Sequence, residues 1–231
     1  MTSSETTPSY PSDAMRYAGY FVYRRVSAPT INASAVHAEM TEFVGDLAAQ
    51  DVVTRGIYDV SAMRADADLM LWLHAPTAEA LQAAFRRFRS SATGRGLAPT
   101  WSAVGLHRES EFNKTHVPAF IDGRPARRWV AVYPYLRSYE WYLLPDTERA
   151  ALLGEHGKLG RDYPAVQNNT IAAFALNDYE WLLAVESDEL DQIVDLMRHL
   201  RSSATRRHVR LETPFFTGRR IDAAGVAEVL A

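Results

Sequence analysis

The chain of 231 residues has 47% hydrophobic and 23% charged side chains, a balance typical of a globular protein with a sizeable core. Its formal net charge of −3 provides no basic field, so we expect no nucleic-acid partner, and the absence of cysteine excludes disulfides and thiolate metal ligands. No apolar run approaches the roughly 18 residues of a membrane span, and the N-terminus has no signal-peptide pattern, so we expect a cytoplasmic protein with no membrane span.

The first half of the chain predicts the order strand, helix, strand, strand, helix, strand. Residues 1–14 precede it and are rich in Ser, Thr and Pro, which predicts a flexible tail. Alternating hydrophobicity indicates the strands, and apolar residues at helical spacing indicate the helices, the second of which has Thr77 as its N-cap. The six elements are expected at residues 16–24, 34–50, 56–62, 68–74, 77–91 and 100–106.

The second half repeats this order, and it also repeats part of the sequence. Arg-Ser-Ser-Ala-Thr occurs at residues 89–93 and again at 201–205, an offset of 112 residues that also aligns several other aromatic and arginine residues without a gap. The second set of elements is expected at residues 128–137, 146–160, 168–176, 179–186, 188–203 and 209–216.

This pattern predicts an α+β fold made of two duplicated ferredoxin-like (βαββαβ) units packed sheet to sheet as a dimeric α+β barrel. Each unit has both helices on one face of an antiparallel sheet, so the two bare sheet faces can cover each other. The predicted boundaries are 15–107 for the N-terminal unit, 108–127 for the connector, 128–220 for the C-terminal unit and 221–231 for a C-terminal segment.

The duplication provides an internal control, because residues that serve only the shared fold should resemble their counterparts. Three positions add a polar atom or a large ring where the first copy has an apolar residue: His156 for Val44, Tyr133 for Phe21 and Trp141 for Pro29. The second copy is therefore the one that we expect to carry the chemistry.

His156 lies on a predicted helix face with Leu152, Leu153 and Leu159, where a lone histidine is more often a core residue bonded to a backbone carbonyl. Its surroundings favour another interpretation. Glycines at 154, 157 and 160 remove side chains around it, although each costs a helix roughly 1 kcal/mol relative to alanine. A flat ligand could approach such a surface, and an imidazole there is suited to be an axial ligand of haem iron.

The other candidates have equally ordinary interpretations. Tyr133 belongs to an aromatic stripe of a predicted strand, which usually packs in a core, and His116 lies in the connector, where a histidine is usually exposed. The arginines near the ends of the second helices, including Arg207, could simply be solvated or could meet substrate carboxylates.

Several segments resemble the coproheme decarboxylases of actinobacteria, in the chlorite dismutase-like superfamily. They are YPYLRSYEWY at 133–142, HGxxxRDY at 156–163, ExPFFTG at 212–218, GLHR at 105–108 and EFNKxH at 111–116. The resemblance covers nearly all of the chain beyond the tail. It implies a haem-binding C-terminal unit and assembly as a homopentamer.

The resemblance also implies an activity, the hydrogen peroxide-dependent conversion of two propionates of coproheme III to vinyl groups, which gives haem b. By this resemblance, His156 is the axial iron ligand, Tyr133 the redox-active tyrosine, His116 the distal base and Trp141 a residue near the substrate. Candidates for holding the substrate carboxylates are Arg137, Ser138, Tyr139 and Arg207. Transient contact with a coproporphyrin ferrochelatase is a further expectation.

Two alternatives stay open at this point. The same fold could support chlorite decomposition or a general haem peroxidase. A haem carrier or sensor without turnover would need His156 but could dispense with Tyr133.

Overall fold

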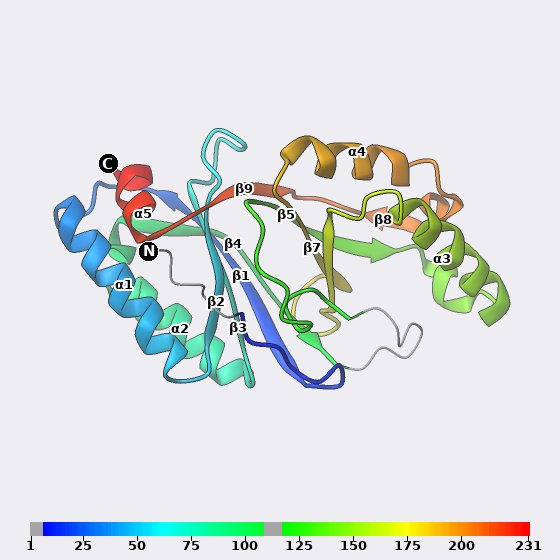
Figure 1. The fold of residues 1–231 in the computed structure, drawn as a ribbon, viewed down its shortest axis with the longest axis horizontal. Helices are drawn as coiled ribbons and strands as arrows, with labels where there is room; N and C mark the ends of the chain where they lie inside the picture. The colour runs from blue at the N-terminus through cyan, green and yellow to red at the C-terminus, as the bar shows by residue number, and fades with distance from the viewer. Residues whose placement is uncertain (1–6, 109–116) are drawn as a thin grey trace.

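The structure is a computed structural model that describes residues 7–108 and 117–231 (Figure 1). The first half of the chain contains β1 (Arg16–Arg25), α1 (Ala33–Ala48), β2 (Val53–Asp59), β3 (Leu69–Ala75), α2 (Ala78–Ser90), the 3-10 turn η1 (Gly94–Gly96) and β4 (Leu97–His107). The second half contains β5 (Trp129–Arg137), η2 (Tyr139–Leu143), α3 (Asp146–Gly160), β6 (Gln167–Ala172), β7 (Trp181–Ser187), α4 (Leu190–Leu200), η3 (Ala204–His208), β8 (Val209–Leu211), β9 (Phe216–Ile221) and α5 (Ala223–Leu230).

All of the strand pairings are antiparallel. In the first half β1 lies between β3 and β4, with β2 beyond β3, and in the second half β5 lies between β7 and β9, with β6 beyond β7. Two pairings join the halves, β2 with β9 and β4 with β6. Because β5 also pairs with β7, the pairings form a closed series that begins and ends at the same strand. The predicted α+β class with an antiparallel sheet is confirmed.

The helices lie outside the strands. In Figure 1, α1, α2 and α5 are on one side of the strands, and α3 and α4 are on the other. One apolar cluster, which includes Tyr20, Trp72, Val132 and Phe216, is built from strands of both halves and is fully buried. Two further clusters lie between strands and helices, one beneath α1 and α2 and a smaller one beneath α4.

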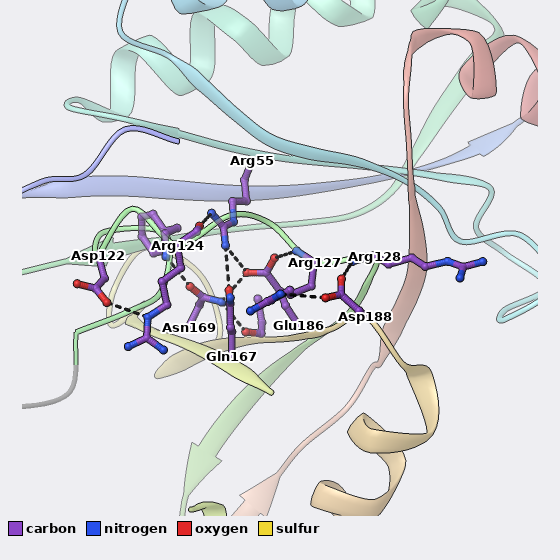
Figure 2. A network of polar contacts seen from close by, with 11 residues as sticks. Arg55, Asp122, Arg124, Arg127, Arg128, Gln167, Asn169, Glu186 and Asp188 are labelled. Carbon is purple, nitrogen blue, oxygen red and sulfur yellow. Dashed lines mark hydrogen bonds and ion pairs between the residues drawn. The ribbon is translucent and has the colours of Figure 1, made fainter. Parts of the chain in front are cut away.

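A buried polar network also connects the halves (Figure 2). Arg55 of β2 donates to Glu186 of β7 at 2.9 Å, and the two side chains are only 2% and 0% exposed. Asn169 of β6 donates to the same carboxylate oxygen at 2.9 Å, and the backbone N–H of Arg127 donates to the other at 3.0 Å. Satisfying each oxygen of a buried carboxylate in this way is what permits it to remain charged.

Several sequence predictions need correction. The strand expected at 56–62 lies at Val53–Asp59, and the strand expected at 209–216 is two strands, β8 and β9, separated by a segment containing Pro214, which has no N–H for a strand pairing. β9 then continues past residue 216 to pair with β2, and α5 docks on α1. The tail expected at residues 1–14 stays a prediction; in its described part, Tyr10 donates its N–H to Ile121 O at 2.8 Å and lies under the Arg16 guanidinium.

Candidate functional site

Helix α3 covers its sheet less than its counterpart in the first half does. It begins after Pro145 with acidic residues in its first turn, which favour the positive end of the helix dipole. Whereas α1 buries Val36, Met40, Phe43 and Leu47, α3 buries only Arg149.

The sheet below α3 shows the same difference. Helix α3 packs against α4 and η3. Of the β7 residues that alternate onto the outer face, Trp181 and Leu183 are only partly buried and Val185 and Ser187 are buried, whereas every residue of β3 is buried. The apolar surfaces of α3 and of this sheet face are therefore incompletely paired by protein, which is typical of a site that accepts an apolar ligand.

His156 is half-buried on α3, and its Nδ1 lies 3.2 Å from Thr205 Oγ1 on η3. Burial and the positive charge of Arg137 lower the pKa of the imidazole, while Glu155 and Glu212 oppose this shift in part. Among the residues that the structure describes, no side chain or backbone group bonds to Nε2. The imidazole is therefore neutral at neutral pH, with one nitrogen held and the other available, as a metal ligand requires.

The glycines around His156 leave open space. A β-carbon built at Gly154, Gly157 or Gly160 meets no atom within 4 Å. Leu152 and Leu153 on the same helix are only partly buried. Both observations fit a surface that a planar apolar molecule could approach.

Tyr133 lies on the face of β5 that packs beneath α4, with its side chain 4% exposed. Its hydroxyl donates to Met197 Sδ at 3.5 Å, and its ring stacks on Phe215 with centroids 4.6 Å apart. Burial raises the pKa of this phenol well above its usual value, and the negative charge of Glu212 adds to the shift. The hydroxyl is therefore protonated at neutral pH, and its one hydrogen-bond partner among the described residues is a weak acceptor, the thioether sulfur.

Arg137, at the end of β5, points inward against aromatic rings. Its guanidinium lies 3.9 Å from the centre of the Trp141 ring and donates to the Tyr135 hydroxyl at 2.8 Å. Burial lowers the pKa of Arg137, yet the group remains a cation with donors to spare. Its positive charge also lowers the pKa of His156, and the same charge would attract an anionic ligand bound near that imidazole.

Ser138 and Trp141 both contact the side chain of His208 on η3. Ser138 Oγ lies 3.1 Å from His208 Nδ1, and the Ser138 N–H donates to His208 O at 3.1 Å. The rings of Trp141 and His208 are 5.5 Å apart. The backbone after β5 is thus tied to η3, the element that also contacts His156.

A cavity of about 450 Å³ lies next to Tyr133. Ala131, Met197 and Phe215, which surround this tyrosine, form part of its wall, and Arg198 and Arg201 contribute cationic groups. Neither Tyr133 nor His156 is itself part of the wall. The cavity, whose wall also includes Met63 of the first half, and the imidazole of α3 are therefore separate features.

Comparison with known proteins identifies this arrangement. The family model described as chlorite dismutase matches residues 33–221. This chain belongs to the chlorite dismutase family. Within the family it is 55% identical over 184 residues to the coproheme decarboxylase of Mycolicibacterium smegmatis, covering 79% of this chain and 80% of that protein. The resemblance predicted from the sequence is confirmed.

Solved structures of the family share the fold. The chlorite dismutase of Candidatus Nitrospira defluvii in complex with imidazole is similar with a TM-score of 0.81 and 20% identity, covering 93% of this chain and 94% of that chain. A mutant of that enzyme in complex with cyanide also has a TM-score of 0.81, with 19% identity and the same coverage. At these identities the likeness concerns the fold alone.

The structure does not place the remaining predicted site residues of this chlorite dismutase family member next to His156 or Tyr133. Tyr139 is 73% exposed, with the Arg210 guanidinium 4.4 Å from its ring, and Arg207 is exposed on η3. His116 lies outside the described residues. Within residues 7–108 and 117–231, no helix has the length and hydropathy to cross a membrane, and no group of three or more His, Asp or Glu side chains is arranged to hold a metal ion.

Sequence reasoning missed two residues of the site. Glu212 is held by Arg201 at 2.8 Å and by Arg206, and its charge acts on both Tyr133 and His156. Glu212 is part of the family-like segment 212–218, but nothing in the sequence indicates that its charge acts on these two side chains. Thr205 carried no signal of its own, because the first copy has the same residue type at the matching position.

Proposed function

We propose that this protein catalyses the hydrogen peroxide-dependent oxidative decarboxylation of two propionates of coproheme III to vinyl groups, giving haem b. The observation that carries the proposal is the combination, in one half of the chain, of an imidazole with an available Nε2 and a buried, protonated phenol. The 55% identity to a coproheme decarboxylase supports the choice of reaction.

The residues present fit an iron porphyrin. His156 Nε2 would hold the iron, and the partly exposed leucines and open glycines of α3 would contact the apolar macrocycle. Arg137 and the arginines around Glu212 are the cations that meet propionates, since an unpaired buried carboxylate costs several kcal/mol. Ser138, Tyr139 and Arg207 are the further candidates for these contacts.

The bound coproheme, at once substrate and redox group, supplies the iron through which hydrogen peroxide acts as oxidant. For each side chain the balance is one propionic acid and one hydrogen peroxide giving one vinyl group, one carbon dioxide and two water molecules. Hydrogen peroxide would take two electrons and two protons, the first of each from the O–H of Tyr133, which would then regain a hydrogen atom from the propionate β-carbon. The resulting carbon radical would supply the second electron and proton as its bond to the carboxyl group breaks and carbon dioxide leaves. Burial suits this role, because a dry phenol in an apolar surrounding exchanges no proton with water.

Two other side chains have assigned roles. His116 would accept a proton from hydrogen peroxide and return it to the departing oxygen, the general acid and base role that an imidazole side chain commonly has. Trp141 stacks on the Arg137 guanidinium and so orients it towards the substrate.

The finer architecture is also proposed. The order of elements, the return of the strand pairings to their start and the apolar cluster shared by both halves support two duplicated ferredoxin-like units packed sheet to sheet as a dimeric α+β barrel. The proposed organisation is a tail at 1–14, units at 15–107 and 128–220, a connector at 108–127 and a C-terminal segment at 221–231. Assembly as a homopentamer, a cytoplasmic location and transient contact with a coproporphyrin ferrochelatase belong to the same proposal.

The test is to load the purified protein with coproheme, titrate hydrogen peroxide and follow the porphyrin mass. The expected result is stepwise loss of two carboxyl groups, which Tyr133→Phe abolishes while coproheme still binds. Tyr58→Phe is the matched control, because Tyr58 is another fully buried tyrosine, whose hydroxyl has no partner within the described residues. Unchanged mass with intact binding indicates a carrier or sensor instead, and oxygen release from chlorite indicates chlorite decomposition.

A further inference from the structure

The partner of the His156 imidazole is a short hydroxyl chain. Thr205 Oγ1 lies 3.2 Å from His156 Nδ1 and 3.0 Å from Ser203 Oγ, which in turn accepts the Thr205 N–H at 3.3 Å. Both hydroxyl residues are nearly inaccessible, with 3% and 2% of their surface exposed. The geometry is therefore set by the protein and is not shared with bulk water.

The first copy uses the same five-residue sequence differently. There the hydroxyl of Thr93 and its backbone N–H, the latter at 2.7 Å, both donate to Glu39 of α1, and the Ala92 N–H donates to the same carboxylate at 2.9 Å. Burial tends to raise the pKa of Glu39, but these hydrogen bonds outweigh it and lower the pKa below its usual value. In this copy the segment serves to anchor a helix.

In the second copy the carboxylate has moved by one helical turn. The residue 112 positions after Glu39 is Ala151, and the carboxylate is Glu155, four residues further along α3. Glu155 accepts the Ala204 N–H at 2.9 Å. Within residues 7–108 and 117–231 no carboxylate bonds to the hydroxyl of Thr205, which contacts the imidazole instead. Moving the carboxylate thus leaves the Thr205 hydroxyl available to His156, a histidine that has no counterpart in the first copy.

We propose that Thr205 is a positioning residue. Its hydroxyl accepts a hydrogen bond from the Nδ1–H of His156 and donates one to Ser203 Oγ, which leaves the lone pair of Nε2 for the iron. This inference rests on the proposed function for the identity of the metal, but the tautomer it specifies is a property of the protein alone. A neutral hydroxyl holds the ring without the charge of a carboxylate, so the imidazole stays neutral. The opposite arrangement, with Thr205 donating to Nδ1, would place the proton on Nε2 and block ligation.

The first test uses the protein without porphyrin. Long-range ¹H–¹⁵N NMR of ¹⁵N-histidine-labelled protein at pH 8, with the signal assigned by its loss in His156→Gln, should show Nδ1 protonated and Nε2 unprotonated. Thr205→Val should convert this signal to the Nε2–H form or to a mixture, and Thr205→Ser should restore it. Thr93→Val is the matched control from the first copy and should leave the His156 signal unchanged.

The second test uses the coproheme complex. Loss of the Nδ1–H hydrogen bond should lower the iron–histidine stretching frequency of the ferrous complex in Thr205→Val and weaken coproheme binding about tenfold or more, with recovery in Thr205→Ser. An Nε2–H tautomer in the wild-type protein, or an unchanged tautomer in Thr205→Val, would overturn the inference. If coproheme fails to bind to a protein with the expected tautomer, the proposed function fails and the hydrogen bond stands.

Discussion

Replacing Glu186 by glutamine removes the negative charge that faces Arg55 and keeps the size of the side chain. In Figure 2 this carboxylate is at the centre of the network between the halves. Arg55 is 2% exposed, so the variant leaves a buried cation without its counter-charge. Breaking a buried ion pair in this way costs about 3–5 kcal/mol, and a chain of this size loses roughly 2–4 °C of Tm per kcal/mol. The expected fall in Tm is therefore about 6–20 °C.

Differential scanning calorimetry and urea unfolding measure this effect, with Asp188→Asn as the matched control. Asp188 lies two residues from Glu186 and pairs with Arg127 at 2.9 Å, but its side chain is 57% exposed, so its removal should cost no more than about 1 kcal/mol. Equal losses of stability in the two variants would refute the reasoning, because they would mean that burial of the pair has no energetic consequence.

The remaining predictions concern pH and ligand charge. His74 is 1% exposed and accepts a hydrogen bond from Arg16, and its pKa is lowered to about 3, chiefly by burial. Its contribution to stability is complete above pH 6.5 and is lost as the pH falls, because only the unfolded chain then takes up the proton; between pH 8 and 5 the loss is about 2 kcal/mol. Urea unfolding of His74→Gln should lack this part of the pH dependence, and an unchanged dependence would contradict the assignment. Arg137→Gln should weaken coproheme binding about tenfold or more, since a charge-assisted hydrogen bond contributes about 1.5–3 kcal/mol. Affinity for an iron porphyrin without carboxylates should stay the same, and an equal loss for both ligands would indicate a packing role.

Much of the fold could be predicted because its elements have strong local patterns. The helix at 146–160 was predicted with its observed bounds, and most strands were located within a few residues. The exceptions depend on tertiary contacts. β9 is extended by pairing with β2 of the other half, and α5 packs on α1, so neither is evident from the local sequence alone.

The site could be predicted only where the two copies of the fold differ in residue type. His156 and Tyr133 stood out because their counterparts are apolar. Thr205 could not, since both copies have threonine and only its partner changes. Met197 and Glu212 come near Tyr133 through the packing of α4 and of the segment after β8, which no spacing in the sequence reveals.

The most direct measurement is a crystal structure of the protein loaded with coproheme. A bond from the iron to His156 Nε2, with the Tyr133 hydroxyl next to a propionate, is the predicted result. Iron bound through a different side chain, or an imidazole at residue 156 that contacts only protein atoms, would contradict the account.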